Sequence, residues 1–266
     1  RPPRSTLFPY TTLFRSQHGT VDHGPYQRGA LTEAMRAQGQ TLMCCATPRS
    51  DLAIDVVRIG GAQPKEKRIY EGRVEAMDRL GPELIRLIVS LPKGERIRFA
   101  CGQYINVILP DGERRAYSFA NAPHDNAKIE LHIGLVPGGR FTGHVFSAMQ
   151  VGDSLRFEGP LGRFTLHESE LPILFVAGAT GFAPVKSIIE DAFHRGLRRP
   201  MWLYWGVRRR DNLYLSALAE QWQRDHDNFH FVPVLSEPDP DDAWQGRSGL
   251  VHEAMLDDFP DTRGYE

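Results

Sequence analysis

The feature that most constrains the fold is a change of hydrophobic pattern near residue 170 of the 266-residue chain. Before it, short apolar runs such as Tyr104–Leu109 alternate with turns such as Pro110–Gly112, a spacing that predicts an antiparallel barrel. After it, apolar runs at 173–177, 202–205 and 229–235 alternate with predicted helices at 184–194, 213–225 and 251–256. Strands separated by helices are typical of a parallel sheet with right-handed crossovers. The sequence therefore predicts a barrel followed by part of a doubly wound α/β sheet.

Composition and charge exclude several classes of protein. Hydrophobic residues make up 41% and charged residues 24%, close to the average of globular domains. A formal net charge of −1 gives no overall attraction to nucleic acid or to an anionic membrane. The longest apolar run, 171–185, is broken by prolines and glycines, so no stretch of about 20 apolar residues can span a bilayer. Three cysteines cannot form a disulfide framework, and the expected location is the cytoplasm.

The first 68 residues carry a weaker pattern. Residues 31–37 predict one short helix with Thr32 as its cap, and residues 52–57 predict a strand. Residues 58–68 contain two glycines, one proline and four basic residues, which is typical of a linker. The run TLFPYTTLFRS at 6–16 resembles the translation of a common sequencing-library adapter. We therefore expect residues 1–16 to be non-native and set them aside from the fold.

The first motif with chemical content is Arg115-Ala-Tyr-Ser118, near the end of a predicted strand. A planar guanidinium pairs with phosphate, a tyrosine ring can lie against a flat heterocycle, and a hydroxyl can bond a ring nitrogen. Taken alone, the same residues would suit a solvated strand edge.

The second motif is PGGRFT at 137–142, which leads into a predicted helix. Two glycines let the backbone approach a ligand, and free N–H groups at a helix start attract a diphosphate. An ordinary hairpin turn followed by a helix cap is the alternative.

The third motif is GATGFAP at 178–184, which joins a predicted buried strand to a predicted helix. Open α/β sheets bind dinucleotide phosphates at this position, although the glycine spacing differs from the common Gly-x-Gly-x-x-Gly fingerprint. A tight strand-to-helix turn without a ligand is the alternative.

The fourth motif is WGVRRRDNLY at 205–214, after the second strand of the predicted parallel sheet. A dinucleotide fold meets the adenosine ribose at this point. Arg208, Arg209 and Arg210 can pair with a ribose phosphate, or can form a solvated loop. The choice between NADH and NADPH stays open.

In this order and at these intervals, the four motifs resemble the ferredoxin–NADP reductase superfamily over about residues 67–266. The resemblance implies a flavin-binding antiparallel β-barrel followed by an incomplete Rossmann-like, nicotinamide-binding α/β domain. It implies that Ser118 is the catalytic residue and lies beside the flavin N5. It implies contacts with FAD for Arg115, Ala116, Tyr117, Ser118, His132, Ile133, Gly139, Arg140, Phe141 and Thr142. It implies NADH or NADPH contacts for Gly178, Thr180, Gly181, Pro184, Trp205, Gly206, Arg208 and Arg209. Ala179 departs from the pattern, since many members have a second glycine there.

The segment LMCCATPRSDLAI at 42–54 resembles the last ligand segment of a plant-type [2Fe–2S] ferredoxin domain, which ends its ligand set with a distant cysteine. The resemblance implies that Cys44 is this metal ligand, with the third ligand expected inside the adapter-like run. Cys101, at the start of a predicted barrel strand, is expected to be structural. The expected domains are therefore a remnant of a β-grasp ferredoxin domain at 17–58, a linker at 59–67, the FAD-binding barrel at 68–168 and the nicotinamide-binding domain at 169–266.

Together these features imply an NAD(P)H-dependent oxidoreductase that passes electrons through FAD and a [2Fe–2S] cluster to a partner protein. The resemblance is closest to reductases that serve a dehydrase in deoxysugar synthesis, and reductase components of ring-hydroxylating oxygenases share the architecture. The motifs also fit a flavin reductase, or a flavin-binding module without turnover. The family also expects a strand after Glu266, so we expect the chain to be truncated at both ends and impaired as it stands.

Overall fold

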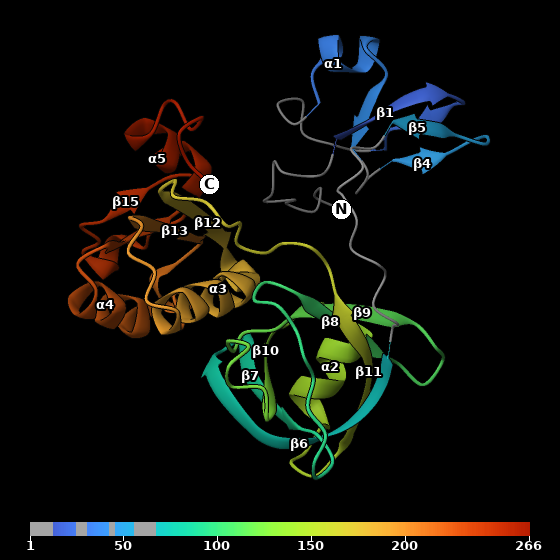
Figure 1. Ribbon diagram of the computed structural model, residues 1–266, viewed down its shortest axis with the longest axis vertical. Coiled ribbons are helices and arrows are strands. Elements are labelled where there is room, and N and C mark those ends of the chain that lie inside the picture. The colour runs from blue at the N-terminus through green and yellow to red at the C-terminus, as the bar shows by residue number, and fades with distance from the viewer. Residues whose placement is uncertain (1–12, 25–30, 43–45, 56–67) are drawn as a thin grey trace. The chain divides into compact units, whose positions relative to one another are not determined.

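The computed structural model describes residues 13–24, 31–42, 46–55 and 68–266, and the chain divides into two units, 1–65 and 66–266 (Figure 1). The predicted linker at 59–67 and residues 1–12 lie outside the described residues. None of the helices in the described part of the chain has the length and apolar character needed to traverse a bilayer.

The described part of the first unit contains two small antiparallel sheets and one helix. Its elements are β1 (Leu13–His18), β2 (Val21–Asp22), α1 (Glu33–Ala37), β3 (Gln40–Leu42), β4 (Thr47–Pro48) and β5 (Ala53–Asp55). β1 lies between β3 and β5, and β2 pairs with β4. The predicted helix is confirmed, because the Thr32 hydroxyl accepts the Met35 N–H and caps α1. The predicted boundary at residue 16 falls inside β1, so the backbone of 13–16 does take part in a sheet.

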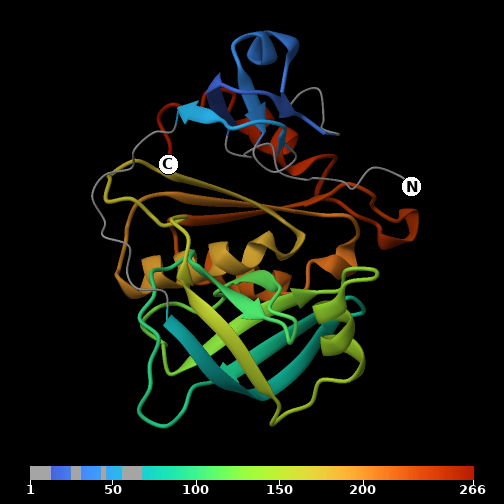
Figure 2. The ribbon, with the colours of Figure 1, turned by 90° about the vertical axis from the view of Figure 1, so that its right-hand side faces the viewer.

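A six-stranded antiparallel sheet opens the second unit. Its strands are β6 (Arg68–Gly81), β7 (Leu84–Ser90), β8 (Tyr104–Ile108), β9 (Arg114–Ser118), β10 (Lys128–Gly134) and β11 (Ser154–Leu161), in the order β10-β7-β6-β11-β8-β9. The two edges meet where the Ala120 N–H bonds the Glu130 carbonyl at 2.8 Å, which confirms a barrel-like closure. The helix α2 (Arg140–Ser147) lies at one end of the barrel and adds Phe141 and Val145 to its core (Figure 2).

A four-stranded parallel sheet follows, as predicted. Its strands are β12 (Ile173–Gly178), β13 (Met201–Val207), β14 (Phe229–Leu235) and β15 (Arg247–Ser248), in that spatial order. The helices α3 (Phe182–His194) and α4 (Ser216–Asp225) cover one face, and α5 (Val251–Asp258) covers the other. Apolar side chains therefore lie on both faces of the strands. The helix α4 begins three residues later than predicted, because residues 214–215 form a turn, closed by the Ser216 N–H on the Leu213 carbonyl, after the 3₁₀ helix at Arg210–Asn212.

The helix α3 lies between the parallel sheet and the barrel (Figure 2). Its Lys186 ammonium donates to the Ala120 carbonyl at 3.0 Å, and its Ser187 hydroxyl donates to the Asn121 carbonyl at 2.7 Å. Both carbonyls belong to the chain just after β9. The helix that follows the third motif is thus hydrogen-bonded to the strand that carries the first motif.

Candidate functional site

β9 presents the first motif on the edge of the barrel sheet. Arg115 and Tyr117 share one side of the strand, and Ala116 and Ser118 share the other, because side chains alternate along a strand. The Tyr117 ring lies 5.3 Å from the ring of Phe141 on α2, between centroids. Burial raises the pKa of Tyr117 to about 12, so the ring stays a neutral phenol. The partly buried Ser118 hydroxyl has no hydrogen-bond partner among the described residues.

The second motif forms the turn before α2. Gly138 has a φ of +72°, and Gly139 precedes the helix. A Cβ at Gly139 would lie 2.5 Å from Thr142 Oγ1 and 2.9 Å from the Val136 carbonyl, so only glycine fits there. The Thr142 hydroxyl accepts the Val136 N–H at 3.2 Å and holds the turn against the helix. Thr142 is buried, so its side chain shapes the turn, and no side chain caps the first turn of α2.

Two guanidinium groups converge beside this helix start. Arg115 bonds a Glu113 carboxylate oxygen at 2.6 Å, and Arg140, the first residue of α2, lies 3.6 Å from the same oxygen. Arg140 also pairs with Asp111. We call Arg115, Arg140 and the first turn of α2 the arginine cradle. The Glu113 carboxylate is an anion held by two arginines beside an uncapped helix start. The same groups would also hold a phosphate. The donor set therefore fits the diphosphate of FAD.

The third motif leads from β12 into α3 through a 3₁₀ turn, Ala179–Gly181. Ala179 has a φ of +46°, a left-handed conformation that costs an L-residue about 1 kcal/mol. Its carbonyl accepts the Trp205 indole N–H at 3.0 Å, which fixes the turn. The start of α3 has no side-chain cap and no acidic residue in its first turn, and Pro184 suits the first turn because it needs no N–H partner there. We call residues 178–184 the nucleotide loop; its open helix start fits a second diphosphate.

The fourth motif is split between buried and exposed residues. Trp205 is fully buried and stacks on Phe182 with ring centroids 3.9 Å apart. A Cβ at Gly206 would lie 2.4 Å from Val251 Cβ, so this glycine is required for the close packing of α5. The side chains of Arg208 and Arg209 are exposed. Of the residues of the fourth motif that are expected to contact a cofactor, only Arg208 and Arg209 have side chains that a ligand can reach.

Two further expected FAD contacts lie on β10. The Ile133 side chain is fully buried in the barrel core. The His132 ring is also buried, with Nε2 2.9 Å from Glu130 Oε1 and Nδ1 2.9 Å from the Tyr214 hydroxyl. Both ring nitrogens are therefore used inside the protein, and only the backbone of His132 and Ile133 is left to contact a cofactor.

The cysteines differ in what the structure describes. Cys44 lies outside the described residues. Within the described ranges, no group of three or more His, Cys, Asp or Glu side chains is arranged to hold a metal ion. Cys101 is buried against the parallel-sheet core, and its thiol lies 3.5 Å from Asp191 Oδ2. Burial raises the pKa of Cys101 to about 11, which fits the predicted structural role.

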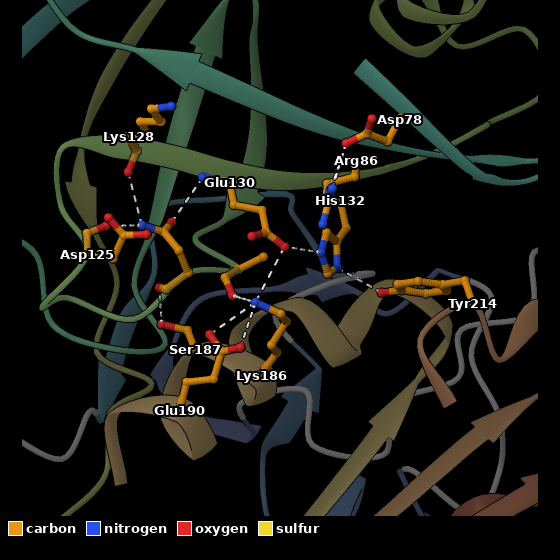
Figure 3. A network of polar contacts seen from close by, with 12 residues as sticks. Asp78, Arg86, Asp125, Lys128, Glu130, His132, Lys186, Ser187, Glu190 and Tyr214 are labelled. Carbon is orange, nitrogen blue, oxygen red and sulfur yellow. Dashed lines mark hydrogen bonds and ion pairs between the residues drawn. The ribbon is translucent and has the colours of Figure 1, made fainter. Parts of the chain in front are cut away.

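A polar network that the motifs did not predict joins the barrel to the nucleotide-binding domain (Figure 3). Lys186 lies 3.4 Å from Glu130 and 2.9 Å from Glu190. Burial opposes ionisation of Glu130, but the His132 hydrogen bond and the Lys186 charge outweigh it and lower the pKa of Glu130 to about 2. We call the network the seam, and it comprises Ala120, Asn121, Glu130, His132, Lys186, Ser187 and Tyr214. The one sequence signal for the seam is Lys186, which lies on the apolar side of the predicted helix at 184–194.

Family comparisons agree with both halves of this site. The oxidoreductase FAD-binding domain matches residues 71–166, and the oxidoreductase NAD-binding domain matches residues 175–265. A CDP-6-deoxy-L-threo-D-glycero-4-hexulose-3-dehydrase reductase from Yersinia pestis is 40% identical over 231 residues, which is 87% of this chain and 69% of that protein. The reductase component DmpP of a Pseudomonas phenol 2-monooxygenase is 38% identical over 246 residues, covering 91% of this chain and 69% of that protein.

Solved structures show the same architecture. The crystal structure of the Amycolatopsis cytochrome P450 reductase GcoB superposes with a TM-score of 0.72 and 32% identity, over 96% of this chain and 77% of that one. The ferredoxin reductase of a carbazole 1,9a-dioxygenase superposes with a TM-score of 0.67 at 24% identity, over 96% and 75% of the two chains. The second likeness bears on the fold alone.

Proposed function

The chain belongs to the ferredoxin–NADP reductase-like family of FAD- and NAD-binding oxidoreductases, and we propose that it supplies electrons to a sugar dehydrase. At the family level, it is an NAD(P)H-dependent flavoprotein reductase of an electron-transfer chain. The dehydrase as acceptor rests on one observation, the 40% identity over 231 residues with a hexulose dehydrase reductase. The sequence motifs resemble the same group of reductases.

In this proposal the arginine cradle binds the FAD diphosphate. Arg115 and Arg140 supply two charged forks, and the first turn of α2 supplies N–H donors. The Tyr117 ring covers the flavin ring, and Ser118 donates its hydroxyl near the flavin N5. Bound FAD supplies a centre that takes up two electrons together and releases them one at a time.

The nucleotide loop binds the nicotinamide cofactor. Thr180 and Gly181 lie at the open start of α3, where backbone N–H groups bond a phosphate. Arg208 and Arg209, exposed after β13, meet the adenosine ribose. Gly134 at the end of β10 approaches this loop, since a Cβ there would lie 3.1 Å from Thr180 Cγ2. The barrel and the nucleotide loop are thus in direct contact, which supports a site where the two cofactors meet.

A second candidate is the reductase component of a ring-hydroxylating oxygenase. Its support is the 35% identity over 233 residues with the reductase component 1 of a Comamonas terephthalate 1,2-dioxygenase. Both candidates use the same flavin and nicotinamide residues. In both, Cys44 would be a ligand of a [2Fe–2S] cluster that carries electrons onward.

The acceptor is tested by coupled turnover of the full-length protein loaded with FAD. We expect NADH consumption under anaerobic conditions to accelerate when a hexulose dehydrase and its CDP-sugar substrate are added. Acceleration by a terephthalate dioxygenase component instead would favour the second candidate. NADPH run in parallel decides the choice of nucleotide.

Ser118 is tested separately from the acceptor. We expect Ser118→Ala to slow flavin reduction by NADH about tenfold in stopped-flow absorbance. The reason is that the hydrogen bond of the Ser118 hydroxyl near the flavin N5 is worth about 1.5 kcal/mol. FAD affinity should stay within about twofold, since the phosphate contacts are untouched. Equal reduction rates for the variant and the wild type would remove Ser118 from the proposal.

A further inference from the structure

The seam has a fixed direction of hydrogen bonding. Glu130 is ionised and can only accept, so His132 Nε2 carries the proton and donates to it. Burial lowers the pKa of His132, so the ring is neutral and Nδ1 is an acceptor. Tyr214 must then donate its hydroxyl hydrogen to Nδ1 over 2.9 Å. Burial raises the pKa of Tyr214 well above its ordinary value, which keeps that hydrogen in place.

Tyr214 also packs against the aromatic residues that hold the nucleotide loop. Its ring meets Trp205 edge-on, with centroids 5.0 Å apart at 86°, and meets Phe182 at 6.0 Å and 75°. Trp205 in turn donates its indole N–H to the Ala179 carbonyl at 3.0 Å. A movement of Tyr214 is therefore passed to the loop through one aromatic ring and one hydrogen bond.

These contacts close a ring between the barrel and the nucleotide loop. The path runs from His132 on β10 to Tyr214, through Trp205 to the loop, and returns from Thr180 to Gly134, two residues from His132 on the same strand. A closed ring of packed and hydrogen-bonded groups fixes a distance far better than one contact does. The distance that this ring fixes is the one between β10 and the nucleotide loop.

We propose that His132 and Tyr214 are positioning residues that set the approach of the nicotinamide to the flavin. The inference deepens the proposed function and rests on it, since it assigns a task to side chains that contact neither cofactor. Proximity effects make a hydride transfer sensitive to such a distance, because displacement of about 1 Å can cost about a hundredfold in rate.

The test compares two tyrosines of the same domain whose hydroxyls are both hydrogen-bonded. Tyr214→Phe removes the hydroxyl that crosses the seam. Tyr204→Phe is the matched control, because its hydroxyl bonds Asp258 at 2.6 Å within the parallel-sheet domain. One readout needs no cofactor: hydrogen-exchange mass spectrometry of the chain, followed at the nucleotide loop and β10. The other is the stopped-flow rate of flavin reduction by NADH in the full-length, FAD-loaded protein, with its dependence on NADH concentration.

For Tyr214→Phe we expect exchange in the nucleotide loop to rise about tenfold, which corresponds to a loss of about 1.4 kcal/mol. The limiting rate of flavin reduction should fall by about tenfold or more, while FAD content stays unchanged. Tyr204→Phe should leave the loop and the limiting rate unchanged. Unchanged exchange, or changed exchange with an unchanged limiting rate, would overturn the positioning role.

The barrel side of the contact gives an independent second variant. His132→Gln keeps one acceptor for Tyr214 and one donor for Glu130, whereas His132→Leu keeps neither. We expect the limiting rate to recover in His132→Gln relative to His132→Leu, and equal rates would contradict the proposal even if Tyr214→Phe failed to fold. A wild-type protein that binds FAD but is reduced by neither NADH nor NADPH would refute the proposed function, whereas the exchange measurement would still judge the ring of contacts.

Discussion

The first turns of α2 and α3 share sequence features but are surrounded by different contacts. Both follow a glycine-containing turn, lack a side-chain cap and have no acidic residue in the first turn. The first residue of α2, Arg140, is exposed and shares the Glu113 carboxylate with Arg115. The start of α3 is held from within by Trp205, which bonds the Ala179 carbonyl and stacks on Phe182. In the proposed function the barrel therefore attracts FAD by charge, whereas packing holds the nucleotide loop in place.

The largest expected effect comes from filling the turn before α2. Gly139→Val places a side chain against Thr142 and the Val136 carbonyl, and we expect FAD affinity to fall about a hundredfold, the equivalent of about 3 kcal/mol. Gly143→Ala is the matched control, because a Cβ there meets nothing within 4 Å. Fluorescence titration with FAD measures both. Full affinity in Gly139→Val would mean that the cradle is elsewhere.

The next effect separates charge from packing. Arg115→Gln and Arg140→Gln should each weaken FAD binding about tenfold, since each removes a charge-assisted phosphate contact. The loss should shrink at high salt, because both arginines are solvent-accessible. Arg68→Gln, an exposed arginine paired with Glu95 at 3.2 Å, is the control that should leave affinity unchanged. Losses of equal size in all three variants would point to net charge instead of a specific cradle.

A smaller effect is expected on the nucleotide side. Trp205→Phe keeps an aromatic ring against Phe182 and loses the hydrogen bond to the Ala179 carbonyl, worth about 1 kcal/mol. We expect the KM for NAD(P)H to rise about fivefold while FAD affinity stays unchanged. Trp202→Phe, on the same strand but facing α5, is the control for strand stability. A loss of FAD affinity in Trp205→Phe would erase the distinction between the two helix starts.

The smallest expected effect is the change of the free energy of unfolding with pH. Burial lowers the pKa of His132 below its ordinary 6.5, so the unfolded chain binds a proton that the folded chain does not bind. The free energy of unfolding should therefore fall as pH drops from 7 towards 5.5. Glu130, with its pKa near 2, adds a stabilisation that is present above about 4.5 and lost only as pH falls from there towards 2.

Urea unfolding at pH 7 and 5.5 measures this slope. We expect it to be shallower in His132→Gln than in the wild type, and unchanged in His144→Gln, which removes an exposed histidine of α2. The arginine cradle contains no histidine, so FAD affinity should be flat across this range. A steeper slope in His132→Gln would contradict the neutral state of the ring.

The elements could be predicted from the sequence because their signals are local. The sequence predicts a strand in the apolar run at 104–109 and a helix at 184–194, and the structure confirms both. Boundaries are harder to predict: α4 starts at Ser216 because a 3₁₀ helix, closed by the Asn212 side chain on the Arg209 N–H, and a turn at 214–215 precede it. Such a side-chain bond leaves no periodic trace.

The site could be predicted only as motifs. The structure brings Arg115 and Arg140 together, as the resemblance implies, but gives Trp205 and Gly206 packing tasks under the loop and against α5. The seam could not be predicted, because His132 and Tyr214 are 82 residues apart and each looks ordinary in its own segment. Contacts of this kind follow from the tertiary fold, which leaves no local pattern in a single sequence.

In the proposed function, the charged cradle of the barrel and the packed loop of the parallel sheet serve one electron-transfer reaction. The most direct measurement is the absorption spectrum of the full-length, FAD-loaded protein before and after anaerobic addition of NADH or NADPH. We expect flavin bands that bleach with one of the two nucleotides. Flavin bands that survive both nucleotides and bleach only with dithionite would contradict it.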